Sequence, residues 1–278
     1  MNLELVVILA ILLILMTAFM FAPLGLGGGV LYVPIFLYLL EWDIHLALTC
    51  SLLLVWTVSL GSRTAHAKGG YAVVEIGRKG TAPSLTGAIL GTLLAALFIA
   101  RLGDMTIKVS ASALLLWVLY KTVKQLNSEL HGDASITEDP PAVEGRLMTQ
   151  YRAGCFGGGV TSGFLGIGGG MIFMMLHRSL LGFRQHQAAG TTFILEIWMV
   201  PMAIITHLIV NGSGPTIIDT LGFNIIPIFL VVSGTAWLGA RTAIKLLPQR
   251  VLTYPFIIAV TASLIRYMID IREVLMTT

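Results

Sequence analysis

Charged residues are scarce in this chain of 278 residues: Asp, Glu, Lys and Arg make up 11% of it, whereas 56% is hydrophobic. Soluble domains usually carry about 25% charged residues, so a surface wetted on all sides is excluded. Several apolar stretches approach the roughly 20 residues that cross a bilayer. They span residues 5–21, 46–60, 193–210 and 223–238. The composition therefore predicts an all-α, polytopic transmembrane helix bundle.

Cysteine is nearly absent, and basic residues are missing from the first part of the chain. The two cysteines, Cys50 and Cys155, form no CxxC motif, which excludes a disulfide framework. We expect both to be small buried fillers, and we expect no metal and no other cofactor. No Lys or Arg precedes Arg63, so the first apolar stretch lacks the basic region of a signal peptide and is expected to be retained. The net charge of +3 is too small to indicate a nucleic-acid partner.

A polar segment interrupts the hydrophobic pattern near the middle of the chain. It contains Asn127, His131, Asp133 and the run Glu138-Asp-Pro-Pro141. The sequence therefore divides into a first transmembrane repeat over 1–121, a polar cytoplasmic linker over 122–152 and a second transmembrane repeat over 153–278.

The two sides of this linker share a glycine motif. Residues 25–29 read Gly-Leu-Gly-Gly-Gly, and residues 166–170 read Gly-Ile-Gly-Gly-Gly, about 141 positions later. An Ala-x-Thr element follows at Ala47 and Ala189, and a tryptophan follows each at Trp56 and Trp198. Matches in the same order indicate an internal duplication.

The distribution of Lys and Arg predicts opposite orientations for the two halves. Basic loops face the cytoplasm, here residues 63–79, 121–152 and 241–250, and the basic-poor connections 41–43, 101–104 and 211–219 are placed outside. The halves are then inverted repeats, an arrangement typical of secondary transporters in the bacterial inner membrane. Each half would hold a Gly-broken segment, either re-entrant or spanning, and three full helices. These begin near His45, Thr81 and Met105, or near His186, Phe223 and Val251.

The glycine runs Gly27-Gly28-Gly29 and Gly168-Gly169-Gly170 are the sharpest candidate site. Each interior glycine costs a helix about 1 kcal/mol relative to alanine, and a break inside a membrane is tolerated where backbone lines a protected cavity. Glycine backbone can form an amide nest for an anion, and a following half-helix would point its positive end there. The alternative is that these glycines only permit close helix packing.

Polar side chains on the next helix of each half extend this candidate site. The hydroxyls of Thr49, Ser51, Thr191 and Thr192 could bind a substrate oxygen, or could bond to their own backbone. Glu196 lies within an apolar span, with Leu54 expected as its counterpart. Such an acid is a functional candidate, and desolvation favours its neutral form. This suits Glu196 to carry a coupling proton, the alternative being a protonated structural acid.

At its glycine motifs the chain resembles the TauE/SafE family of sulfite exporters. The resemblance rests on Gly27-Gly28-Gly29 with Pro34, on Gly168-Gly169-Gly170, on the Ala-x-Thr helices and on the polar linker, and it covers essentially the whole chain. The second motif departs from the first, with Met175 at the proline position. The resemblance implies transport of sulfite, organosulfonates or related sulfur-containing anions.

Other functions fit the sequence less well. No HExxH motif occurs, and no histidine is placed to activate Ser162, so we do not expect an enzyme. A transporter of a cation, or a proton-coupled transporter of another small solute, is the alternative, with Glu196 as the ion ligand. A lone carboxylate is a poor site for a divalent ion. The expected partners are a small anion and the lipid bilayer, and an oligomer is compatible with the sequence.

Overall fold

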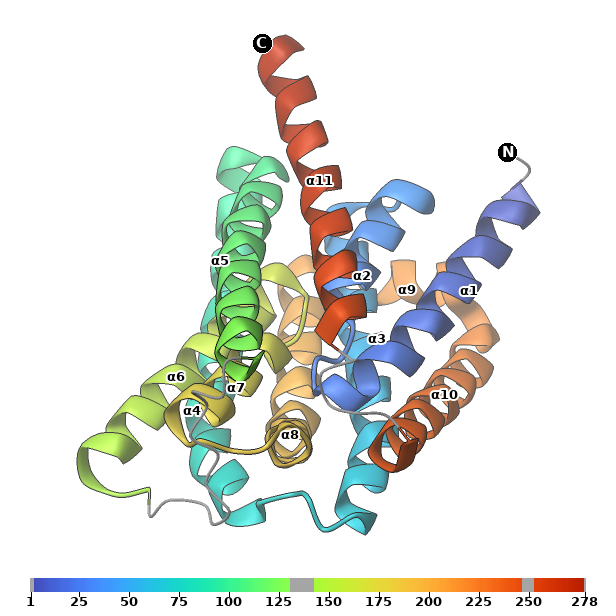
Figure 1. The fold of residues 1–278 in the computed structure, drawn as a ribbon. Coiled ribbons are helices and arrows are strands. Elements are labelled where there is room, and N and C mark those ends of the chain that lie inside the picture. The colour runs from blue at the N-terminus through green and yellow to red at the C-terminus, as the bar shows by residue number, and fades with distance from the viewer. Residues whose placement is uncertain (1–2, 131–142, 247–252, 278) are drawn as a thin grey trace.

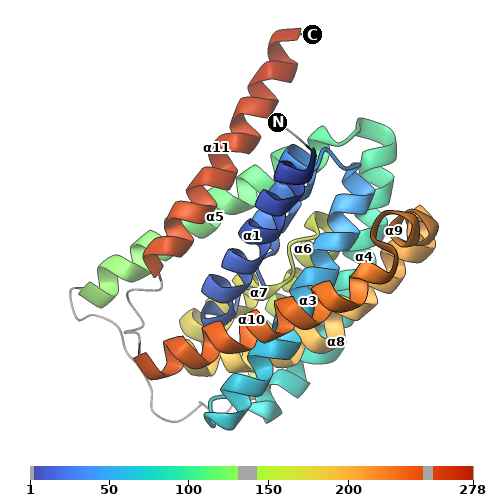
Figure 2. The same ribbon diagram turned by 90° about the vertical axis from the view of Figure 1, so that its right-hand side faces the viewer.

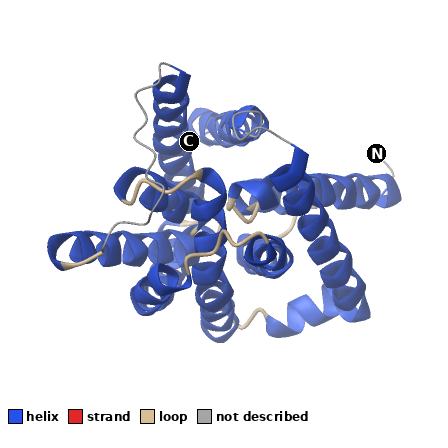
Figure 3. Ribbon diagram, turned by 60° about the horizontal axis from the view of Figure 1, so that its bottom comes forward, coloured by secondary structure: helices blue, strands red, loops and turns tan. Residues whose placement is uncertain are grey.

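The computed structural model describes residues 3–130, 143–246 and 253–277, and within these ranges every regular element is helical (Figure 3). The elements of the first half are α1 (Leu3–Phe21), η1 (Ala22–Leu24), α2 (Gly29–Pro34), η2 (Ile35–Leu39), α3 (Ile44–Lys68), α4 (Val74–Leu102) and α5 (Met105–Leu130). Those of the second half are α6 (Gly145–Leu165), α7 (Gly170–Met175), η3 (Leu176–Leu180), α8 (Gln185–Asn211), α9 (Gly214–Leu221), η4 (Gly222–Asn224), α10 (Ile225–Leu246) and α11 (Thr253–Thr277).

The described part of the chain contains seven helical segments that are long and apolar enough to cross a membrane. Two of them, α3 and α8, form the centre, with 78% and 61% of their most apolar windows buried, against 33% or less for the other five. The outer helices expose large apolar side chains such as Leu12, Leu97 and Leu230. Apolar surface on this scale suits lipid rather than water, so the expected polytopic membrane bundle is confirmed.

Neighbouring helices come from both halves of the sequence. The first-half helix α4 packs against α6 and α8, and the second-half helix α10 packs against α3 and α1. Figures 1 and 2 show α1 beside α10 on one side of the bundle. The two halves are therefore interlocked rather than stacked.

Glycines make the contact between α4 and α6 close. A Cβ atom at Gly87 or Gly91 on α4 would collide with the carbonyl oxygens of Phe156 or Val160, and one at Gly159 on α6 with the carbonyl oxygen of Ser84. Small residues let membrane helices approach backbone to backbone. These glycines outside the repeated motif thus serve helix packing.

Some element boundaries differ from those expected. Helix α4 begins at Val74, not near Thr81, because its first turns contain Glu75, Arg78 and Lys79 and so lie outside the apolar pattern. Helix α9 precedes α10, which begins at Ile225. Helices α5 and α6 extend into both ends of the polar linker expected over 122–152, whereas residues 131–142 and the expected start at Val251 lie outside the described residues.

A polar cluster joins α11 to α5 and η2. Asp270 pairs with Lys108 and accepts a hydrogen bond from the hydroxyl of Tyr38 at 3.2 Å. The guanidinium of Arg266 lies 4.2 Å from the centroid of the same tyrosine ring. These contacts fix the last helix against the first half of the chain.

Candidate functional site

Two glycine turns interrupt the helices at equivalent places in the two halves. Gly25 follows η1 with φ of 72°, and Gly166 caps α6 with φ of 66°. Both angles lie in the left-handed region, which residues with a Cβ atom rarely adopt. The chain then turns and re-enters a helix at Gly29 or Gly170.

The two turns lie directly against each other. A Cβ atom at Gly29 would collide with the backbone of Ile167, and one at Gly170 would lie 2.9 Å from Cα of Leu26. These contacts are equivalent, because 170 − 29 and 167 − 26 both equal 141. Two backbone segments from separate halves therefore meet with no side chain between them.

Glu196 on α8 is completely buried beside this junction. A Cβ atom at Gly170 would lie 2.7 Å from its Oε1, and one at Gly168 3.4 Å from the same oxygen. The corresponding distance for Gly27 is 3.5 Å. Its other oxygen, Oε2, accepts a hydrogen bond of 2.6 Å from the hydroxyl of Ser59 on α3. One carboxyl group thus faces both glycine turns and links the two central helices.

The residue equivalent to Glu196 is Val55, and the expectation of Leu54 was wrong. A Cβ atom at Gly27 or Gly168 would lie 2.7 or 2.8 Å from Cγ1 of Val55, so both turns contact both side chains. Since 196 − 55 equals 141, the same shift relates α3 to α8, which begin at Ile44 and Gln185. Alignment of Trp56 with Trp198 shifts the two halves by one residue too many and gives Leu54 instead of Val55.

The other predicted glycines do not face Glu196. Gly28 has φ of 90°, and a Cβ atom there would meet the ring of Tyr32 at 2.8 Å. Gly169 instead has φ of −85°, and a Cβ atom there would collide with the ring of Phe173. The two turns therefore follow a similar path, but the φ angles of Gly28 and Gly169 differ.

The four predicted hydroxyls have different partners. Thr49 donates to the carbonyl oxygen of His45 at 2.8 Å, and Thr191 to that of Gln187 at 2.7 Å, both within their own helices. Ser51 instead donates to the carbonyl oxygen of Gly166 at 2.7 Å, so it ties α3 to the second glycine turn. Only this last hydroxyl joins the glycine junction directly.

Thr192 belongs to a separate buried network around His177. Its hydroxyl lies 3.1 Å from Nδ1 of His177, and the other ring nitrogen lies 3.1 Å from the hydroxyl of Tyr151. Tyr151 in turn donates to the carbonyl oxygen of Ile76 at 3.1 Å. Both nitrogens of this histidine are therefore satisfied, which fits a structural role.

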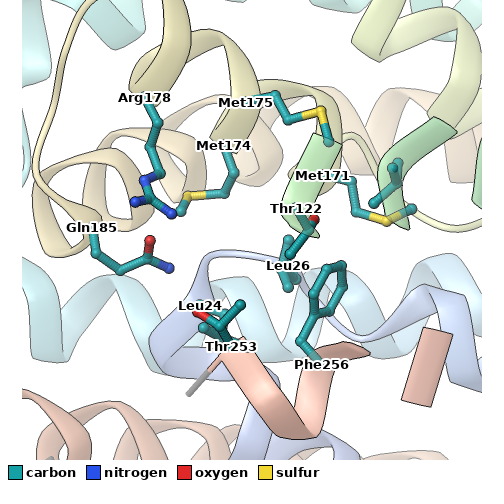
Figure 4. A pocket seen from close by; sticks show the side chains of 11 residues that line it. Leu24, Leu26, Thr122, Met171, Met174, Met175, Arg178, Gln185, Thr253 and Phe256 are labelled. Atoms are coloured by element: carbon teal, nitrogen blue, oxygen red, sulfur yellow. The ribbon is translucent and has the colours of Figure 1, made fainter. Parts of the chain in front are cut away.

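A cavity of about 50 Å³ reaches the glycine turns from one side. Leu26 of the first turn and Met171 of the second half both line it, as do residues of α5 and α11. Figure 4 shows the polar ends of Arg178 and Gln185 directed into it. A water molecule needs about 10–15 Å³ of such space, so the cavity has room for a small ion.

Two features of this site escaped the sequence reasoning. Ser59 was missed because a serine in an apolar helix is usually bonded to its own backbone. Its hydroxyl also lies 2.8 Å from the carbonyl oxygen of Val55, in addition to Glu196. Two histidine pairs were missed as well. The spacing of 141 between His45 and His186, and between His66 and His207, was the available signal.

Comparison with known proteins agrees with this arrangement of helices and glycine turns. Residues 10–267 match the family model described as Sulfite exporter TauE/SafE. No curated protein and no solved structure matches the chain. Among the described residues, no group of three or more His, Cys, Asp or Glu side chains could hold a metal ion. The match covers nearly the whole chain, which therefore belongs to the TauE/SafE family of sulfite exporters.

Proposed function

We propose that this protein carries a small sulfur-containing oxyanion, such as sulfite or an organosulfonate, across the bacterial inner membrane. The anion binds at the junction of the two glycine turns, and Glu196 carries a proton with it. One observation supports this most directly: a single buried carboxyl group faces the glycine turns of both halves.

The position of Glu196 supports coupling of anion transport to proton transport. Two unit charges of like sign about 4 Å apart repel by about 4 kcal/mol at an effective dielectric constant of 20. An oxyanion at the glycine junction would lie within this range of Oε1, so it binds well only when Glu196 is protonated. Proton and anion then occupy the site together and leave it together.

The arrangement of the halves supports an alternating mechanism. We infer that they are inverted repeats, since equivalent contacts recur at a shift of 141 and α1 and α6 start from opposite ends of the bundle (Figure 1). Glycine-broken segments from inverted repeats commonly form the central binding site of secondary transporters. Rocking of one half against the other would expose the junction to each side in turn.

The cavity next to the junction is the proposed route of entry. Arg178 and Gln185 supply a positive charge and an amide at its mouth, while mostly apolar side chains, among them leucines and methionines, line the rest. A guanidinium group favours oxyanions because its donors match two oxygens at once. Gln185 adjoins His186, which contacts the α3–α4 side of the bundle, where Arg63, Lys68, Arg78 and Lys79 predict the cytoplasm.

Flux in liposomes tests this proposal. The purified protein is reconstituted, and uptake of sulfite, an organosulfonate, sulfate and chloride is measured with and without a pH gradient. Saturable uptake of a sulfur-containing anion, stimulated by the gradient, is expected. Glu196→Gln should retain exchange of labelled for unlabelled anion at equal pH, because it mimics the neutral acid, but should lose the response to the gradient.

A transporter of a cation, or of another small solute with protons, is the competing function. It is favoured by the presence of a carboxyl group, a possible cation ligand, beside both glycine turns. Uptake of sodium or of a divalent metal that is lost in Glu196→Gln, without flux of any sulfur-containing anion, would overturn the anion proposal and support this one.

A further inference from the structure

The central helices carry a row of buried polar side chains on one side of Glu196, here called the polar stripe. On α3, Ser59, Ser62 and His66 are spaced by three and four residues, which places them on one face of the helix. All three are completely buried. Ser59 bonds directly to Glu196, and Nδ1 of His66 lies 2.9 Å from the carbonyl oxygen of Ser62.

The stripe continues to the end of the bundle through a histidine of α8. The ring centroid of His186 lies 6.2 Å from that of His66, and His186 is 8% exposed. Tyr71, in the turn between α3 and α4, lies 5.3 Å from His186 and is partly exposed. The polar groups thus lead from the central carboxyl group towards the surface at the α3–α4 turn.

Several atoms along this stripe lack a protein partner. They are the hydroxyl oxygen of Ser62, Nε2 of His66 and Nδ1 of His186. Buried polar atoms are nearly always hydrogen-bonded to protein or to water. Three such atoms in one row, each on a side chain at least nine-tenths buried, indicate a path that water molecules can bridge.

Two of the three positions on α8 that are equivalent to Ser59, Ser62 and His66 are apolar. Adding 141 to Ser59 and Ser62 gives Val200 and Ala203, both completely buried. Adding 141 to His66 gives His207, whose two ring nitrogens already have partners. One lies 2.8 Å from the carbonyl oxygen of Gly163, and the other lies 3.0 Å from the side-chain nitrogen of Asn211. Val200 and Ala203 therefore offer no polar group where Ser59 and Ser62 offer two hydroxyls.

From this asymmetry we infer that Glu196 exchanges its proton with the α3–α4 side through Ser59, Ser62, His66 and His186, whereas it exchanges with the opposite side only when rocking of the halves exposes the junction. The inference rests on the proposed proton coupling and adds the route and its sidedness. The proton leaves the carboxyl group and moves along hydroxyl, water and imidazole groups, each of which accepts one proton and releases another. The anion follows the separate cavity lined by Arg178.

Other titratable groups near the stripe do not offer a competing route. Arg63 and Lys68, on the same helix, are exposed. On the adjoining helix α4, Glu75 and Lys79 pair with each other at 2.7 Å at the surface. The titratable side chains observed to face the stripe are therefore Glu196, His66 and His186, with Tyr71 at its outer end.

Hydrogen–deuterium exchange of the carboxyl group tests the route without any cargo. The full-length protein is placed in nanodiscs at a pH where Glu196 is protonated, and the isotope shift of its C=O stretch is followed by infrared spectroscopy. Glu196→Gln identifies the band. A single positioned acid or base typically contributes about 10²–10⁴-fold to the rate of a reaction that needs proton transfer, so Ser62→Ala with His66→Gln should slow the exchange by at least about tenfold.

Matched variants keep this test decisive. Ser62→Thr retains the hydroxyl and should exchange at the wild-type rate. His207→Gln alters the equivalent histidine, on the side of Val200 and Ala203, and should not change the exchange rate. Equal rates in wild type and in the Ser62→Ala, His66→Gln variant, or slowing by His207→Gln alone, would overturn the inference.

Transport measurements separate this inference from the proposed function. Ser62→Ala with His66→Gln should keep sulfite exchange at equal pH and lose accumulation driven by a pH gradient. Absence of sulfite exchange in wild type, together with slowed isotope exchange in the double variant, would reject the proposed cargo and keep the proton route. Accumulation equal to wild type in the double variant would reject the route and keep the cargo.

Discussion

The hydroxyl of Ser59 donates a 2.6 Å hydrogen bond to Oε2 of Glu196 and so joins the two central helices of the bundle. The contact is completely buried on both sides. It is also specific to one half, since the residue equivalent to Ser59 is Val200. A single serine therefore both holds the candidate coupling acid and distinguishes the two halves.

Loss of this hydrogen bond should destabilise the protein. A buried acceptor left without its donor costs about 1–3 kcal/mol, so Ser59→Ala should lower the free energy of unfolding by that amount. Ser59→Thr keeps the hydroxyl and should lose much less. Denaturant unfolding in detergent micelles, followed by near-UV circular dichroism, measures the difference. Equal stability of the alanine variant and wild type would contradict the assigned contact.

Alanine at either glycine facing Val55 should disrupt the junction. Gly27 and Gly168 have φ of 66° and 76°, which costs a residue with a Cβ atom about 1–2 kcal/mol. The added methyl group also overlaps Val55, and overpacking costs a further 1–3 kcal/mol or so. Thermal unfolding of Gly27→Ala and Gly168→Ala should show both losses.

Two further variants separate these contributions. Val55→Ala combined with Gly168→Ala should recover the stability that is lost to overpacking, but not the stability that is lost to backbone strain. Gly157→Ala is the matched control, because no atom lies within 4 Å of its Cβ position on α6. It should leave stability unchanged or raise it by about 0.5–1 kcal/mol. A Gly157→Ala variant as damaged as Gly168→Ala would show that the junction is not special.

Moving the carboxyl group to its equivalent position should preserve part of the function. Glu196→Val should abolish proton-driven anion uptake, whereas Val55→Glu combined with Glu196→Val should recover some, because both positions face the same two glycines. Uptake in liposomes measures this, with Leu54→Glu combined with Glu196→Val as the control. Recovery by the control and not by the Val55 variant would contradict the assigned equivalence.

Removing the positive charge at the cavity mouth should weaken anion binding. A hydrogen bond to a charged group contributes about 1.5–3 kcal/mol, so Arg178→Gln should raise the KM for the anion about tenfold or more. The maximal rate should change little, because Arg178 acts at entry and not at the junction. Arg63→Gln, which alters an exposed arginine, is the control. Equal KM values for both variants would argue against this entry route.

The sequence was sufficient to predict the all-helical membrane bundle, because long apolar segments and scarce charge are local properties. It also identified Glu196, since an acid is conspicuous among apolar residues. The partners of Thr49, Thr191 and Thr192 depend on helix register and on a histidine 15 residues away, which hydropathy does not reveal. The direct contact of the two glycine turns, and Val55 as the counterpart of Glu196, required the packing of the two halves.

The interlocking of the halves has a consequence for biogenesis. Helix α1 packs against α10, which the ribosome completes some 200 residues later. At about 5–20 residues per second, α1 waits roughly 10–40 s in the membrane before its neighbour is synthesised. Its side chains are almost all apolar, with Glu4 as the only charged residue among them, and this composition suits a helix that is surrounded by lipid during that interval. The high mean hydropathy of this segment, 3.1 in its most apolar window, thus suits a helix whose neighbour is synthesised much later.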